Sequence, residues 1–349
     1  MCEQYLPLII DQVSSLCLSD SEETPQLPEL LIHYGLTIDE FTHLRSLLIQ
    51  KIDSSNTIFN ITSDCFYLPY LTHLKIIECH VANDKNSHQI INNIWRLPRL
   101  KHCTLDVIFE GGLTFAELPI ISTSIEYLLI KNVIFSSIGL THLLNSTSYL
   151  QHLCIQFGQS SNAELDTRHI IPSIISLKLN FDGSLAALTN ILQKVIETRE
   201  NSQSELQLKN LLNRAPRLEF LCIDATLFLL LTQLNITHSS LRRLHLKHYR
   251  AKMNRYMNAT QCSILTDSLI GRQCEVLRIR VENRAIVLDL VRTMHNLRAL
   301  NCECQDDIWN NNSLLFSKDE LIEWFRRVLP EKCSIRRQES RLIQMWINQ

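Results

Sequence analysis

The chain has 349 residues, of which 45% are hydrophobic and 20% are charged, and its formal net charge at pH 7 is -2. This is an ordinary soluble composition, long enough for two globular domains or for one solenoid. The longest apolar run, around Leu227 to Leu231, is far shorter than the roughly 18 residues that cross a bilayer, which excludes a membrane-spanning protein.

The N-terminal sequence MCEQYLPLIIDQV contains Glu3 and no lysine or arginine. It therefore lacks the basic region of a secretory signal and the arginine-rich face of a transit peptide. We expect an intracellular protein, in the cytoplasm, with the nucleus as the alternative. The 12 cysteines are spread through the chain, and inside a cell reduced thiols explain them more simply than disulfides.

A pattern of the form aliphatic-x-x-aliphatic-x-aliphatic recurs along the whole chain. Its copies begin at Val13, Leu44, Leu71, Leu100, Ile125, Leu150, Ile174, Leu218, Leu241, Cys274 and Leu297. The starts are separated by 31, 27, 29, 25, 25, 24, 44, 23, 33 and 23 residues. These intervals bracket the period of leucine-rich repeats and depart from it clearly only once. The sequence therefore predicts a solenoid.

Each copy of the pattern predicts a short strand followed by a helix. The last two aliphatic residues alternate with single residues, so they point to one side of a strand and the intervening residues to the other. Apolar residues at helical spacing follow several strands. They are Ile90, Ile91, Ile94 and Trp95; Leu188, Ile191, Leu192 and Val195; and Val287, Leu290, Val291 and Met294. The fold class that follows is α/β, a leucine-rich-repeat solenoid with a curved, parallel, concave sheet and convex helices.

We expect a single solenoid over residues 1–349, with residues 1–30 as the first repeat and N-terminal cap. Residues 180–216 hold the 44-residue interval, which is either a degenerate repeat or an inserted helix pair. Residues 317–349 form the predicted C-terminal cap. There, Ser317 and Glu320 fit a capping box that starts a helix ending before Pro330. The apolar cluster between Leu342 and Ile347 is expected to cover the last repeat.

The phrases LPYLTHLKIIEC, LPRLKHCTLD and APRLEFLCID, with Cys79 where such repeats carry Asn or Cys, resemble the repeats of F-box/leucine-rich-repeat proteins. This resemblance implies that the repeats hold a substrate while an F-box docks on the Skp1 adaptor of a cullin-type ubiquitin ligase. The segment from Tyr5 to Ile10 is similar to an F-box opening. However, Val13, Leu16 and Leu18 already fit the first repeat, and the later F-box helices are missing. The resemblance thus implies the recognition half without the adaptor-binding half.

We find no catalytic or phosphate-binding motif in the sequence, so we expect no enzyme activity and no cofactor. Cys302-Glu303-Cys304 lacks the second ligand pair of a structural zinc site. We therefore expect Cys302 at a core position, with Cys304 just beyond it, and no metal.

Charge is distributed unevenly along the chain. Residues 1–44 contain eight acidic and no basic residues, whereas residues 241–284 contain ten Lys or Arg and three acidic residues. The strand register places a set of cations on the concave side of successive strands: Arg243, His245, Lys247, Arg278 and Arg280, preceded by Phe220 and Cys222. Such a patch favours an acidic protein partner, the alternative being solvated side chains without a ligand. The sequence pI near 6.7 argues against nucleic acid.

A second group of candidate residues occupies one outward position in four successive repeats: His73, His102, Tyr127 and His152. A histidine row can bind metal or sense pH, and ordinary surface polarity is the alternative. We include these residues in the predicted partner-binding face.

These observations predict a non-catalytic protein–protein interaction scaffold, specified by the resemblance as a ubiquitin-ligase substrate-recognition module without a clear F-box. The alternative is a free-standing leucine-rich-repeat inhibitor or decoy of a partner enzyme.

Overall fold

The computed structural model describes residues 9–20, 37–82, 85–110, 124–133, 143, 147–157, 174–181, 212, 215–225, 228–229, 232, 238–247, 256–307, 319–331, 333–338 and 341–347. Several predicted features lie outside these residues, namely most of the F-box-like opening, nearly all of the irregular segment 180–216, and Ser317. Among the helices that are described, none is long and apolar enough to cross a membrane.

The chain divides into two compact units. Unit 1 consists of Met1–Ile174 and Phe181–Asn210, and unit 2 of Ile175–Asn180 and Leu211–Gln349.

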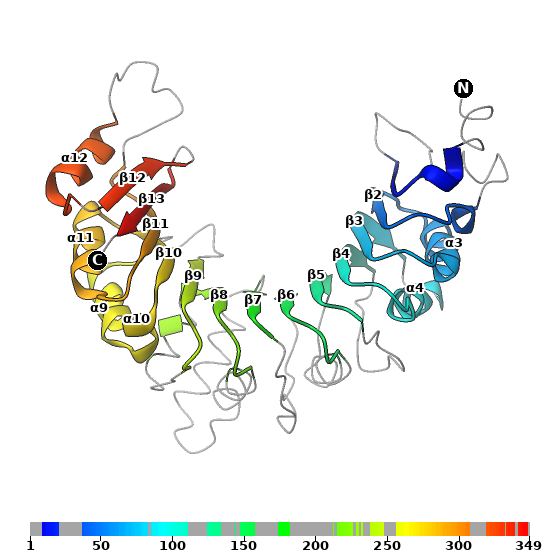
Figure 1. Cartoon of the computed structure of the whole chain (residues 1–349), viewed down its shortest axis with the longest axis horizontal. Coiled ribbons are helices and arrows are strands. Elements are labelled where there is room, and N and C mark those ends of the chain that lie inside the picture. The colour runs from blue at the N-terminus through cyan, green and yellow to red at the C-terminus, as the bar shows by residue number, and fades with distance from the viewer. Residues whose placement is uncertain are drawn as a thin grey trace. The chain divides into compact units, whose positions relative to one another are not determined.

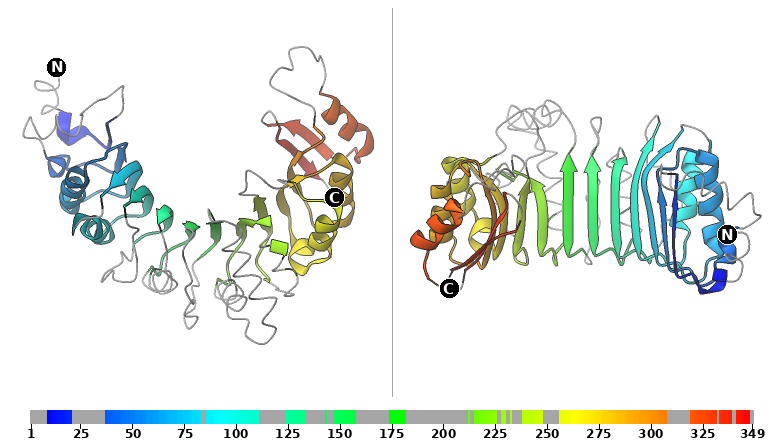
Figure 2. Two further views of the ribbon diagram at one scale, coloured as in Figure 1. Left: turned by 180° about the vertical axis from the view of Figure 1, so that it is seen from behind. Right: turned by 90° about the horizontal axis from the view of Figure 1, so that it is seen from above.

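Unit 1 contains parallel strands that neighbour one another in chain order (Figures 1 and 2). They are β1 (Ser15–Ser19), β2 (Ser46–Gln50), β3 (His73–Val81), β4 (His102–Phe109), β5 (Tyr127–Val133) and β6 (His152–Phe157). Short 3-10 helices lie at Ile10–Gln12, Ile38–Glu40 and Cys65–Tyr67. The helices α3 (Ser55–Asp64) and α4 (Lys85–Trp95) lie on one side of these strands.

Unit 2 continues the parallel pattern and ends in an antiparallel pair. Its strands in spatial order are β7 (Ser176–Phe181), β8 (Phe220–Asp224), β9 (Arg243–Lys247), β10 (Val276–Val281), β11 (Ala299–Cys304), β13 (Ile343–Ile347) and β12 (Cys333–Arg337). Its helices are α9 (Ala259–Asp267), α10 (Leu269–Gln273), α11 (Arg284–Thr293) and α12 (Glu320–Val328). Strand β13 runs antiparallel to β11, and β12 runs antiparallel to β13.

The predicted repeat register is confirmed strand by strand. Each of the strands β1 to β11 begins two residues after a predicted repeat start, as β3 does after Leu71 and β8 after Leu218. The aliphatic positions form the core, where Leu71, Leu74 and Ile76 are buried. Burying one such side chain contributes about 1.5–3 kcal/mol, so the repeated pattern fixes which face of every strand points inward. The fold is therefore an α/β leucine-rich-repeat solenoid, as predicted.

The described helices bury the apolar residues that the sequence indicates. Ile90, Ile91, Ile94 and Trp95 are buried on α4. On α11, Val287 and Leu290 are buried, Val291 is half-buried, and Met294 is buried directly after the last turn. Asparagine is the N-cap of α9 and of α11. The Asn258 side chain accepts a hydrogen bond from the N–H of Gln261 at 2.9 Å, and the Asn283 side chain accepts one from the N–H of Ile286 at 3.2 Å.

The C-terminal helix begins later than predicted. Helix α12 starts at Glu320, and Asp319 rather than Ser317 is its N-cap, with its carboxylate accepting from the N–H of Ile322 at 3.1 Å. Aspartate caps helices as well as serine does, so the capping-box spacing pointed to the wrong residue. After α12 the chain returns to the sheet, and Met345 lies opposite Leu300 with both side chains buried. Strand β13 thereby covers the edge of β11.

Candidate partner-binding site

The residues between the buried aliphatic positions point to the opposite face of each strand, which we call the polar face; it is the face predicted to be concave. In unit 2 the third residues of the parallel strands lie in register, and the C-terminal strands extend the series. We call this series the Arg278 row. It consists of Lys178, Cys222, His245, Arg278, Asn301, Gln344 and Arg336.

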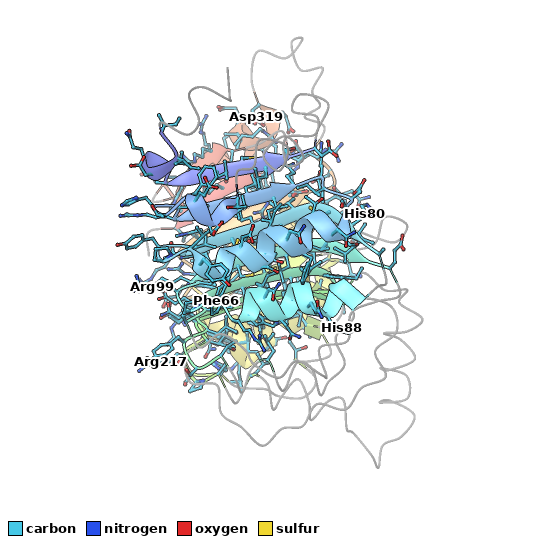
Figure 3. The ribbon with its side chains drawn as sticks, turned by 90° about the vertical axis from the view of Figure 1, so that its right-hand side faces the viewer. Phe66, His80, His88, Arg99, Arg217 and Asp319 are labelled. Carbon is cyan, nitrogen blue, oxygen red and sulfur yellow. The ribbon has the colours of Figure 1, made fainter. Side chains whose placement is uncertain are left out.

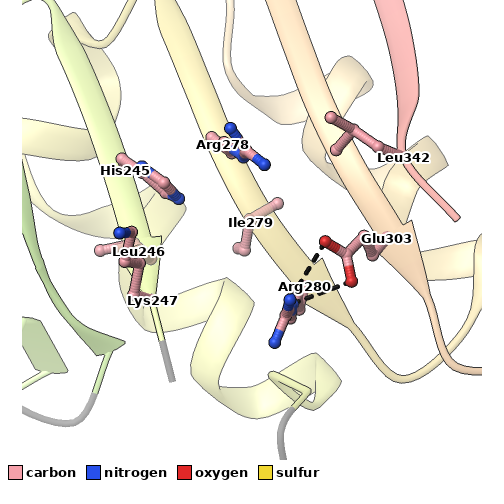
Figure 4. A pocket seen from close by; sticks show the side chains of 8 residues that line it. All are labelled: His245, Leu246, Lys247, Arg278, Ile279, Arg280, Glu303 and Leu342. Carbon is pink, nitrogen blue, oxygen red and sulfur yellow. Dashed lines mark hydrogen bonds and ion pairs between the residues drawn. The ribbon is translucent and has the colours of Figure 1, made fainter. Parts of the chain in front are cut away.

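A pocket of about 320 Å³ opens over β9 and β10 (Figure 4). Its lining residues are His245, Leu246, Lys247, Arg278, Ile279, Arg280, Glu303 and Leu342. Four of the six candidates predicted in unit 2 are among them. The other two, Arg243 and Phe220, lie opposite each other in the neighbouring row that the first residues of the strands form.

The electrostatic field in this pocket is positive. Burial lowers the pKa of His245 to about 3, and the nearby charges of Arg278, Lys247, Lys178 and Arg280 lower it in the same direction. The imidazole is therefore neutral at physiological pH, and it becomes a hydrogen-bonding group rather than a further cation.

The pocket's arginines differ in how they are paired. Arg280 forms an ion pair with Glu303 on β11, with 2.9 Å between Nε and Oε2. Arg278 makes no ion pair within the described part of the chain, and its neighbour in the row, Asn301, is neutral. The charge of Arg278 is thus available to an anion from outside the chain.

The C-terminal strands add a third cation to the Arg278 row, after Lys178 and Arg278. The Arg336 guanidinium on β12 donates to Gln344 Oε1 from Nε at 3.1 Å and from Nη2 at 2.9 Å. It also lies 4.7 Å from the centroid of the Trp346 ring. These contacts hold an exposed arginine in one orientation without neutralising it.

Arg336 and Lys178 were not among the predicted site residues. Lys178 is the third residue of β7, the strand of the repeat that starts at Ile174, so aligning that faint repeat with its neighbours would have found it. Arg336 carried no such signal, because its place depends on the antiparallel pairing of β12 with β13.

Cys222 takes the place in the row that the register predicts, between Lys178 and His245, but it is fully buried rather than outward and exposed. Its side chain is short and its neighbours on both sides are long, so the row closes over the thiol.

In unit 1 the predicted ring residues lie side by side on the polar face, and we call them the His73 row. The rings of His73 and His102 are stacked, with centroids 4.3 Å apart and planes inclined by 5°. Tyr127 follows at 5.8 Å from His102, and His152 at 6.0 Å from Tyr127. Burial lowers the pKa of His102, and His73, Lys101 and His152 lower it further. The row is thus a series of half-buried rings in which the neutral form of His102 is favoured.

A cluster of exposed aromatic residues precedes this row at the end of the strands where β3 begins. Phe66, Tyr67 and Tyr70 are 53%, 70% and 46% exposed. The Arg99 guanidinium lies 5.9 Å from the Tyr70 ring centroid. Phe66 and Arg99 can be followed in Figure 3, where His80 marks the other end of β3.

The histidine row does not form a metal site within the described residues, where no group of three or more His, Cys, Asp or Glu side chains could hold an ion. Cys302 and Cys304 are both buried on the core side of β11. A hydrogen bond to Cys302 and burial raise the pKa of the Cys304 thiol far above its usual range, which favours the protonated form.

No family model matches the sequence. No curated protein matches it either. Among solved structures, the chain is similar to one in the crystal structure of the Rad7 and Elc1 complex in yeast. The identity is 12% and the TM-score 0.40, over 82% of this chain and 68% of that one. It is also similar to an internalin (inlF) from Listeria monocytogenes, with 14% identity and a TM-score of 0.32 over 82% of this chain and 86% of the other. The fold assignment rests on the strand register described above.

Proposed function

We propose that this protein is a non-catalytic interaction scaffold that binds an acidic protein partner on the polar face of unit 2. The observation that carries the proposal is Arg278, a half-buried cation in the pocket that no carboxylate neutralises within the described residues. Arg278 lines the same pocket as Lys247 and Arg280, and an anionic partner bound there would offset the repulsion among these positive charges.

The arrangement suits recognition of a protein surface. A positive depression concentrates its field and speeds encounter with acidic partners. Arginine also binds carboxylates through two parallel hydrogen bonds, which adds direction to the attraction. Solenoids of stacked repeats commonly bind partners across their strand faces.

The experiment that tests this proposal compares capture by two double-reversal variants. In the first, Arg243→Glu and Arg278→Glu reverse two cations of the polar face. In the control, Arg272→Glu and Arg292→Glu reverse two exposed cations on helices α10 and α11, so the net charge change is the same. Partners retained from native extract by the wild type and quantified by mass spectrometry should be lost only with the first variant. Equal capture by both variants would remove the polar face from the proposal.

The resemblance to F-box/leucine-rich-repeat proteins supports a finer candidate role as the substrate-recognition part of a ubiquitin ligase. Recovery of Skp1 and a cullin with the wild-type protein would support that role. One stoichiometric enzyme partner without Skp1 would support the inhibitor or decoy role instead.

A further inference from the structure

We infer that the acidic partner lies across unit 2 as an extended segment whose carboxylates are four residues apart. This inference rests on the proposed function and specifies the chemistry of the partner. Its basis is the spacing of positive charge along the Arg278 row.

The cations of the row recur at every third strand. Lys178 on β7 is followed by Cys222 and His245, and then by Arg278 on β10. From Arg278 the row passes through Asn301 and Gln344 to Arg336 on β12. The residues between the cations are uncharged, since His245 is neutral at physiological pH.

This recurrence sets a distance. Neighbouring strands lie about 4.8 Å apart, so three steps across the sheet span roughly 14 Å. An extended peptide advances about 3.4 Å per residue, so four residues span roughly the same length. An even separation also places both side chains on one face of the peptide, whereas an odd separation turns one of them away. In an α-helix four residues advance only about 6 Å, which is too short to join two of these cations.

The three cations are available to such a segment. Neither Lys178 nor Arg278 has a carboxylate partner in the described ranges. Arg336 is exposed and is oriented by Gln344 and Trp346, which are both uncharged. Arg280, by contrast, lies in the adjacent row and is already paired with Glu303. The regular spacing of cations without a carboxylate partner is therefore found along the Arg278 row.

Synthetic peptides test the spacing directly. Three fluorescein-labelled peptides of identical composition, made of threonine, serine and valine with two glutamates, would place the glutamates two, three or four residues apart. Fluorescence anisotropy in about 0.05 M salt would give the affinity of each for the full-length protein. We expect the four-residue spacing to bind about fivefold more tightly than the others, as one additional exposed charge pair allows.

Variants connect the preference to the row. Arg278→Gln, which removes the cation common to both pairs, should reduce the affinity for the four-residue spacing to that for the three-residue spacing. Arg336→Gln leaves Lys178 and Arg278 three strands apart and should reduce that affinity by no more than about twofold. Arg278→Lys, which keeps the charge, should retain most of it. Arg272→Gln, on helix α10, is the matched control and should change nothing. Circular dichroism verifies that each variant is folded.

Two negative outcomes are distinguishable. Equal binding of all three peptides, or a preference for the two- or three-residue spacing, would overturn the extended four-residue arrangement. The proposed function, binding of an acidic partner, would still stand. Absence of binding by every acidic peptide, with Arg278→Gln indistinguishable from the wild type, would overturn this inference and the proposed function together.

Discussion

Arg280 and Glu303 form an ion pair between β10 and β11, whereas Arg278, two residues earlier on β10, faces the neutral side chain of Asn301. The two arginines line the same pocket but contribute differently to it. Arg280 and Glu303 together add no net charge, so the positive field that a partner meets comes largely from Arg278 and its neighbours.

This difference predicts unequal effects on partner binding. Arg278→Gln should weaken binding of the peptide with the four-residue spacing about fivefold, since it removes one exposed charge pair. The charge-neutral double variant Arg280→Gln with Glu303→Gln should change binding by less than about twofold. Anisotropy titrations of both proteins measure this, and a larger loss for the double variant would show that Arg280 is the contact.

His245 should respond to an acidic ligand by taking up a proton. Its pKa in the free protein is lowered to about 3 by burial and by Arg278, so it is neutral above that pH. A carboxylate bound nearby would favour the imidazolium and raise the pKa. Binding would then strengthen as pH falls through the raised pKa, and would weaken again below about pH 4, where the glutamates of the ligand become protonated. An NMR titration of ring ¹⁵N shifts with and without peptide measures both values, and an unchanged pKa would place the ligand elsewhere.

The core positions should tolerate truncation far less than the polar-face positions. Leu153→Ala and Leu221→Ala each remove a buried side chain, so each should lower the free energy of unfolding by about 2–5 kcal/mol. The matched changes His152→Ala and Arg243→Ala each lie one strand position before a buried leucine, Leu153 and Leu244, and should cost about 0.5 kcal/mol or less. Urea denaturation measures all four, and similar losses would contradict the register.

The C-terminal strands should depend on Arg337. This side chain is largely buried and pairs with Asp307, at 2.7 Å between Nη1 and Oδ2, and also with Asp319, the N-cap of α12. Burial alone would lower its pKa, but the two carboxylates raise it, so it stays charged. Arg337→Leu removes the cation that faces the buried Asp307 carboxylate and should cost about 3–5 kcal/mol. Arg326→Ala, which breaks an exposed pair with Glu323 on α12, should cost less than about 1 kcal/mol.

The same cluster gives a pH dependence with a definite sign. Burial alone would raise the pKa of Asp319, but hydrogen bonds from Arg337 and from the N–H of Ile322 lower it below its usual range. The stabilisation it provides is therefore present above the pKa of the unfolded state and is lost as pH falls through the folded value. Thermal melts between about pH 6 and pH 3 should show a smaller loss of stability in Asp319→Asn than in the wild type.

The fold was predictable because one pattern recurs in every repeat. A shift of one residue would turn Leu74 and Ile76 outward, so the aliphatic spacing determines both the strand and its buried face. The positions of His245, Lys247, Arg278 and Arg280 in the pocket followed from that register. The pairing of Arg280 with Glu303 did not, since it depends on how long side chains on two neighbouring strands meet.

Other parts of the site depend on tertiary structure that no local pattern carries. Arg336 reaches the polar face because β12 returns antiparallel beside β13. Cys222 is buried because Lys178 and His245 flank it in the row. Ser317 and Asp319 are both good capping residues by type. Asp319 caps α12, and its ion pair with Arg337 favours that start.

The most direct test of the central claim reverses the charge of the peptide and, separately, the charge of the polar face. Anisotropy would compare a labelled glutamate-rich peptide and a matched lysine-rich peptide on the wild type and on the double variant Arg243→Glu with Arg278→Glu. We expect the wild type to bind only the acidic peptide, more weakly as salt rises from about 0.05 to 0.5 M, and the variant to bind only the basic one. Binding of the acidic peptide by the variant within about twofold of the wild type would contradict recognition through the polar face of unit 2.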